Sequence, residues 1–173
     1  MREPEPIIRL ADPKSETDLG DAAKIISSAF LKQAVAKTDK PTITIDELKV
    51  CLSSKQNELF LLGHPPIGTA LLTVQGDHVY IWCVSILPTF QGQNLGLKLM
   101  DYMERRASEV HRKKIAIVTV VYHPHHKQES LMKWYEKQGY EYSLDKLAPD
   151  MDQFWKPEYH KELHLKEFRK ILR

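Results

Sequence analysis

Segment 89–96 combines residue types and a position that suit the binding of a negatively charged ligand. It contains Gly92 and Gly96, which allow a tight turn and a close approach of the backbone to a ligand. An apolar run at 78–87 precedes it and residues with helical spacing follow it, so the free amides of a helix's first turn point into the segment. Such amides favour an anion. The segment therefore predicts a site for a phosphate-bearing cofactor.

The glycine spacing excludes two common phosphate-binding loops. A dinucleotide fold requires Gly-x-Gly-x-x-Gly with an acidic residue about twenty positions later, and a nucleoside-triphosphate loop requires Gly-x-x-x-x-Gly-Lys-Ser/Thr. Neither pattern occurs in this segment. The run 84–96 instead resembles the acetyl-CoA loop of the GCN5-related N-acetyltransferases (GNAT), whose pattern is Gln/Arg-x-x-Gly-x-Gly/Ala after a strand. Asn94 stands where that family usually has its first glycine, and Asn is the other residue that best tolerates a positive φ.

A second segment, 131–140, is similar to another signature of the same family, an aromatic-Tyr-x-x-x-Gly-aromatic pattern after the second parallel strand. In this chain Trp134 and Tyr135 begin the pattern, and Gly139 and Tyr140 end it. Two signatures in the right order carry more weight than either alone. The resemblance spans 7–140 in the order of the expected elements.

The resemblance implies an α/β fold, in which helices flank a central mixed β-sheet and one parallel strand pair splays apart. It also implies acetyl-CoA as cofactor, with its pantetheine arm on backbone groups of the first parallel strand and its pyrophosphate on the loop amides. Gln128 and Leu131 replace the Asn and Ala that the family usually has near the start of the second-signature helix. The expected cofactor-binding residues are Val84, Ser85, Ile86, Gln91, Gly92, Gln93, Asn94, Leu95, Gly96, Leu97, Gln128 and Leu131.

The implied reaction moves an acetyl group from a thioester to an amine. It needs stabilisation of charge on the carbonyl oxygen, removal of a proton from the incoming ammonium and a proton for the departing thiolate. Tyr135 matches the family tyrosine that supplies this last proton. A phenol has an ordinary pKa of about 10, against about 8.5 for a thiol, so it is protonated at neutral pH. The alternative is that Tyr135 is a core aromatic beside Trp134.

Candidates for the base come from several positions. His123 follows the second parallel strand, and an ordinary histidine pKa near 6.5 suits proton removal at neutral pH, although most loop histidines are only solvated. Tyr80 and Glu58 on neighbouring strands are other candidates. His123, His125 and His126 have no Cys or acidic ligand after them at a familiar spacing, so we expect no metal site.

Composition limits the classes of protein. The chain has 173 residues, which predicts a single domain over 1–173, and a net charge of +2, which does not favour nucleic acid as a partner. Cys51 and Cys83 form neither a disulfide framework nor a metal-ligand spacing; Cys83 as an acetyl carrier is an alternative to inert packing in a strand. The acidic, proline-rich start is no targeting peptide and no apolar run is long enough to span a membrane, so we expect a cytoplasmic monomer or homodimer.

The rest of the chain is expected to position these segments. Asp18 or Asp21 is expected to cap a first helix, and Thr44 with Glu47 has the spacing of a capping box. A later helix is expected at 127–138 and a loop at 144–158. The expected strands are 7–10, 58–62, 67–74, 78–87, 115–121 and 160–168.

The predicted function is therefore transfer of an acetyl group from acetyl-CoA to a primary amine. The preferred acceptor is a small molecule of the polyamine or arylalkylamine type. Two alternatives stay open: a lysine or N-terminal amino group of a protein, and a module that binds acyl-CoA without catalysis.

Overall fold

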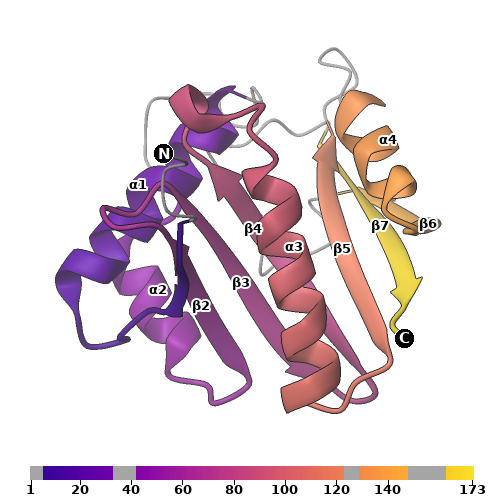
Figure 1. Ribbon diagram of the computed structural model, residues 1–173, viewed down its shortest axis with the longest axis horizontal. Coiled ribbons are helices and arrows are strands. Elements are labelled where there is room, and N and C mark those ends of the chain that lie inside the picture. The colour runs from indigo at the N-terminus through magenta and orange to yellow at the C-terminus, as the bar shows by residue number, and fades with distance from the viewer. Residues whose placement is uncertain (1–5, 33–41, 123–128, 148–162) are drawn as a thin grey trace, which may run out of the picture.

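The computed structural model describes residues 6–32, 42–122, 129–147 and 163–173 (Figure 1). Its strands form a seven-stranded sheet in the order β1-β2-β3-β4-β5-β7-β6. The pair β4–β5 is parallel and the other neighbouring pairs are antiparallel. The strands are β1 (Ile8–Leu10), β2 (Asn57–Leu62), β3 (Gly68–Gln75), β4 (His78–Ile86), β5 (Ile115–Tyr122), β6 (Glu141–Leu147) and β7 (His164–Ile171). The predicted mixed α/β sheet with its parallel pair is confirmed.

Helices cover the two faces of this sheet (Figure 1). α1 (Glu16–Lys32) packs on β3 and β4 and α2 (Ile45–Leu52) on β2, while α3 (Leu95–Arg105) packs on β3 and β4 from the other face. α3 continues into the short π-helix η2 (Arg106–Val110), and α4 (Glu129–Lys137) lies near β6. None of the helices that the structure describes has the length and apolar character needed to cross a membrane.

Alternating strand residues build two cores, one under each helical layer. The α3 core contains Phe60, Leu72, Ile81 and Val118 with α3 residues such as Met100. The core under α1 and α2 is built from the intervening positions and from the helices, and includes Leu19, Leu48, Leu59, Leu61 and Leu71. Outside the β-bulges, this alternation fixes which face of the sheet a strand side chain occupies, because successive residues of a strand point to opposite faces.

The capping of α2 is confirmed, and that of α1 is not. Thr44 accepts a bond from the Glu47 amide and the Glu47 side chain returns one to the Thr44 amide. In α1, Asp18 lies inside the helix and its amide donates to Ser15 Oγ at 3.1 Å. The Asp18 carboxylate instead accepts two 2.7 Å bonds from Arg9, which ties the helix to β1. The predicted cap of α1 by Asp18 was wrong, because the Asp18 carboxylate forms this long-range ion pair with Arg9 instead.

Asp18→Asn is expected to lower the free energy of unfolding at pH 7 by about 2 kcal/mol, because it breaks charge-assisted bonds to a half-buried partner. The hydrogen bond from Arg9 is the main reason that the pKa of Asp18 lies below its ordinary value. The contribution is therefore complete above about pH 4 and is lost as the pH falls through the folded-state pKa. Thermal unfolding at pH 7 and pH 3 measures this, with Asp21→Asn as control. A deficit of equal size at both pH values would contradict the ion-pair explanation.

The C-terminal strands differ from the predicted boundaries. β6 continues through Leu147, where a loop was expected from 144, and β7 begins at His164 and reaches Ile171. β7 lies between β5 and β6, so both edges of its backbone are paired. β6 is an edge strand, and edge strands tolerate polar residues such as those that suggested a loop. The rest of the expected loop, 148–158, lies outside the described residues.

Candidate active site

β4 and β5 begin as a parallel pair and then separate. Their pairing runs from His78 with Ile115 to Ile81 with Val118. β4 nevertheless continues to Ile86 and β5 to Tyr122, and the ribbons diverge toward these ends (Figure 1). Beyond Ile81 the edge of β4 that faces β5 therefore has no parallel ladder bonds. Unpaired backbone groups of this kind need other partners, and a ligand can supply them.

A β-bulge, which the sequence did not predict, lies in the unpaired half of β4. Thr69 pairs with Ser85 and Leu71 pairs with Trp82, so Cys83 and Val84 together oppose one residue of β3. Cys83 has a positive φ of 51° and packs against the core under α1 and α2. A bulge bends its strand and redirects nearby groups. Nothing in an apolar run marks which residue will bulge, so no sequence signal could have located it.

The predicted anion-binding loop connects β4 to α3 through the short 3₁₀ helix η1 (Pro88–Phe90). Gln91 Nε2 donates to the Ile86 carbonyl at 3.0 Å, which fastens the loop to the end of β4. Gly92 has φ 81° and open space where a side chain would begin. Asn94 has φ 60° and ψ 15°, and its side chain caps none of the first-turn amides of α3. The loop therefore presents backbone amides without a side-chain cap, as an anion site requires.

Asn94 adopts the left-handed conformation that its replacement of the family glycine requires. We expect Asn94→Gly to keep the affinity for acetyl-CoA within about twofold, because glycine adopts this conformation freely. A valine at position 94 is expected to weaken binding about tenfold, because a β-branched residue in this conformation strains the loop by roughly 1–2 kcal/mol. Isothermal titration calorimetry of both variants measures the difference. Equal affinities for the two variants would show that the loop conformation does not control binding.

Gly96 brings the two signature segments together. A Cβ atom at position 96 would lie 3.5 Å from Trp134 Cζ2 and 3.7 Å from Cη2. The indole of α4 therefore packs directly over the first turn of α3. This contact explains a small residue at position 96 without reference to a ligand, and it fixes the start of α3 relative to α4.

Tyr135 lies in an aromatic cluster that includes Trp134. Its ring centroid is 5.0 Å from that of Trp134, 5.7 Å from that of Tyr140 and 6.5 Å from that of Phe168. The residue is 6% exposed, and burial raises the pKa of its hydroxyl well above its ordinary value. Within the described part of the chain, no group hydrogen-bonds this hydroxyl. Tyr135 thus packs as a core aromatic, as the alternative interpretation of the sequence expects, and its role as the acid stays a prediction.

The candidate bases have different positions. His123 lies outside the described residues, as does Gln128 of the cofactor set. Glu58 accepts bonds from Arg106 Nε at 2.8 Å and from His111 at 3.0 Å. Burial disfavours its charged form, yet the bonds from Arg106 and then His111 outweigh burial and hold the pKa of Glu58 below its ordinary value. A carboxylate whose oxygens already accept bonds from two side chains is a poor proton acceptor.

The remaining predicted residues fit an extended acyl-CoA molecule. Ser85 and Ile86 are buried at the end of β4, and Ser85 Oγ is a buried polar atom with no hydrogen-bond partner among the described residues. Val84 and Leu131 are partly buried and pack against the α3 core. Loop residues 91–94 are exposed to solvent, where a ligand can reach them. The unpaired strand edge, the orphaned hydroxyl and the uncapped amides together provide polar contacts for a thioester arm and a pyrophosphate.

A sequence model of the acetyltransferase (GNAT) family matches residues 27–140, which is more than half of the chain. The chain belongs to this family. Its membership confirms the enzyme class predicted from the sequence, an N-acetyltransferase that uses acetyl-CoA. The matched segment contains both signatures, the opened strand pair and Tyr135.

Solved structures share the fold at low sequence identity. A GNAT family acetyltransferase from Elizabethkingia anophelis, solved with acetyl-CoA bound, is 14% identical with a TM-score of 0.67, covering 98% of this chain and 100% of its own. A ribosomal-protein alanine N-acetyltransferase from Escherichia coli is 15% identical with a TM-score of 0.71, and the match covers 96% of this chain and 94% of that protein. A spermidine N-acetyltransferase variant from Vibrio cholerae is 13% identical with a TM-score of 0.67, and the match covers 97% of this chain and 94% of that protein. No curated protein sequence matches the chain.

Proposed function

We propose that this GNAT acetyltransferase acetylates a primary amine of a small molecule of the polyamine or arylalkylamine type. The acetyl-transfer part of the proposal is supported by the opening between β4 and β5 together with the uncapped amides at the start of α3. Small-amine acetylation also agrees with the spermidine N-acetyltransferase among the structural neighbours. The neighbour that acts on a ribosomal protein makes a protein amino group the second candidate.

In the proposed site, residues of this chain bind the cofactor along two stretches of backbone. The unpaired edge of β4 from Val84 to Ile86 holds the pantetheine arm, and the amides from Gln91 to Leu97 hold the pyrophosphate. Leu131 contributes an apolar wall, and Gln128 is proposed to contact the cofactor from the same side. Bound acetyl-CoA supplies the acetyl thioester as the reacting group.

The proposed acid is Tyr135. As the amine nitrogen bonds to the acetyl carbon and the carbon–sulfur bond breaks, the Tyr135 hydroxyl gives its proton to the sulfur. The proton that the amine loses returns to the solution through a base, for which His123 stays the predicted candidate, and the phenol is reprotonated. Because burial raises the pKa of Tyr135, the hydroxyl carries its proton at the start of each cycle.

Release of CoA thiol with a panel of acceptors tests this function. The panel contains spermidine, phenylethylamine, a lysine peptide with a blocked N-terminus and a peptide with a free N-terminus. We expect amine-dependent thiol with one of the small amines. Thiol release with the peptides alone would assign a protein acceptor instead. Tight acetyl-CoA binding without amine-dependent release of CoA thiol from any acceptor would indicate a module that binds acyl-CoA without catalysis.

A further inference from the structure

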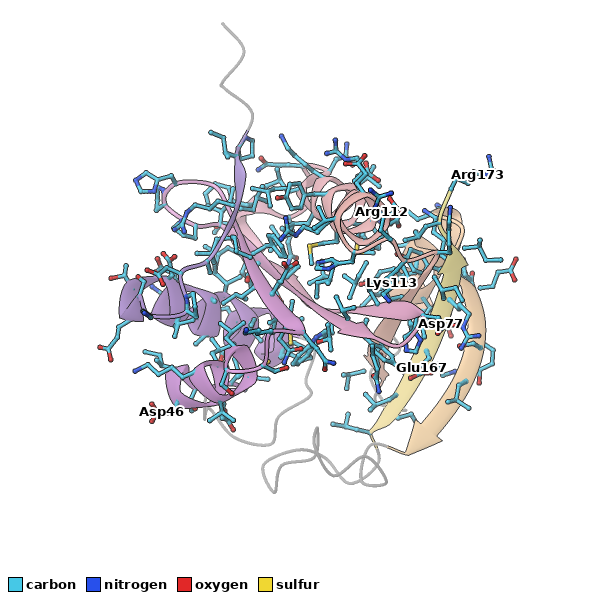
Figure 2. All side chains as sticks on the ribbon, turned by 90° about the horizontal axis from the view of Figure 1, so that it is seen from below. Asp46, Asp77, Arg112, Lys113, Glu167 and Arg173 are labelled. Atoms are coloured by element: carbon cyan, nitrogen blue, oxygen red, sulfur yellow. The ribbon has the colours of Figure 1, made fainter. Side chains whose placement is uncertain are left out.

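A strip of polar side chains crosses β4, β5 and β7 on the face of the sheet toward α1 and α2. Tyr80 shares this face with Trp82, which packs against the core under α1 and α2. On β7, Phe168 lies in the α3 core, so its neighbours Glu167 and Arg169 point to the opposite face. Asp77 and Glu167 lie on the α1 and α2 side in Figure 2, and Arg112 lies on the α3 side. Burial, then the charge of Glu167, raises the pKa of Tyr80, and the charge of Arg169 opposes this rise, which agrees with the location of all three side chains on one face.

Glu167 and Arg169 have different cross-strand neighbours. Arg169 is exposed, lies beside Glu141 in the strand register, and its charge acts on Asp77 and on Tyr80. Glu167 pairs with Thr119 on one side and with Leu144 on the other, and neither carries a charge. Its side chain is half-buried, and no cation among the described side chains forms an ion pair with it. A half-buried carboxylate that forms no ion pair can attract a cationic ligand, even with the exposed Arg169 two residues away on the same face.

The location of Glu167 relates this charge to the opening between β4 and β5. Thr119 follows Val118, the last β5 residue that pairs with β4. Glu167 is therefore level with the base of the opening, one strand beyond β5. Neighbouring strands lie about 4.8 Å apart, so the β7 backbone lies one such spacing beyond β5, the strand that borders the opening. This displacement from the opening suits a second charge on the same acceptor.

We propose that Glu167 is a positioning residue that binds a second, non-reacting ammonium of the acceptor, with Tyr80 and Thr119 beside it. The acceptor class is then a diamine or polyamine whose reacting amine enters between β4 and β5. This inference rests on the proposed small-amine function and narrows it, since an arylalkylamine has no second ammonium.

The test compares 1,4-diaminobutane with butylamine, which differ by the second amine alone. We expect the wild type to acetylate the diamine with a kcat/KM at least about tenfold higher, and Glu167→Gln to remove most of this preference through KM while butylamine kinetics stay unchanged. Glu167→Asp is expected to restore part of the preference, because it keeps the charge. Glu109→Gln, at an exposed position in η2, is the matched carboxylate-to-amide control.

Equal losses for both amines in Glu167→Gln, or no loss for either, would overturn the role of Glu167. Calorimetric titration of 1,4-diaminobutane into the CoA-bound protein gives an independent readout. If no amine is acetylated, the proposed function fails, yet a diamine affinity that falls at least about tenfold in Glu167→Gln still supports the binding role. An unchanged diamine affinity rejects it, and thermal unfolding of each variant identifies any loss due to misfolding.

Discussion

Tyr135→Phe is expected to lower kcat by about 10²- to 10³-fold, while the affinity for acetyl-CoA stays within about twofold of the wild type. The substitution removes one hydroxyl and keeps the ring that packs against Trp134, Tyr140 and Phe168. Loss of the acid leaves the thiolate to depart without a proton, which affects the chemical step and not binding. Steady-state kinetics and calorimetry with acetyl-CoA measure the two quantities separately.

The control for this prediction is Tyr142→Phe. Tyr142 is 54% exposed on β6 and has a ring contact with Phe168, so it tests loss of a phenol near the same cluster. We expect its kcat to stay within about twofold of the wild type. A Tyr135→Phe enzyme with normal kcat would remove Tyr135 from the acid role. A large loss of thermal stability in Tyr135→Phe would assign the residue a structural role instead.

Local sequence patterns predicted the elements whose structure depends on neighbouring residues. The capping box of Thr44 and Glu47 forms as expected because both partners lie in one helical turn. Asn94 was expected to tolerate a positive φ in place of the family glycine, and it adopts φ 60°. The nearly unbroken apolar runs at 78–87 and 115–121 also located the parallel pair β4–β5. In each case the information that decides the structure lies within a few positions of the residue concerned.

Features that depend on distant partners were not predictable in this way. Asp18 has the character of a helix cap, but Arg9 on β1 engages its carboxylate. Glu58 was a candidate base, and its pairing with Arg106 and His111 depends on where α3 ends over the sheet. Glu167 has an ordinary sequence context. The cross-strand register places the uncharged Thr119 and Leu144 beside it, and no described side chain forms an ion pair with it.

Gly96→Val is expected to weaken acetyl-CoA binding at least about 100-fold, which corresponds to about 2.7 kcal/mol. The Cβ atom alone would make an ordinary contact with Trp134 at 3.5 Å, and the added methyl groups would extend toward the indole or toward the loop. Either direction displaces the amides of the first turn of α3. Gly96→Ala adds the Cβ atom only and is expected to lose less than about fivefold.

A double variant distinguishes the two directions. If the valine acts by pushing α3 away from the indole, Gly96→Val combined with Trp134→Leu should recover most of the affinity, because the smaller side chain vacates the space next to position 96. If the valine acts by occupying the place of the pyrophosphate, the double variant stays as weak as the single one. Unchanged affinity in Gly96→Val itself would contradict both explanations, since it would mean that the cofactor binds away from the amides that begin α3.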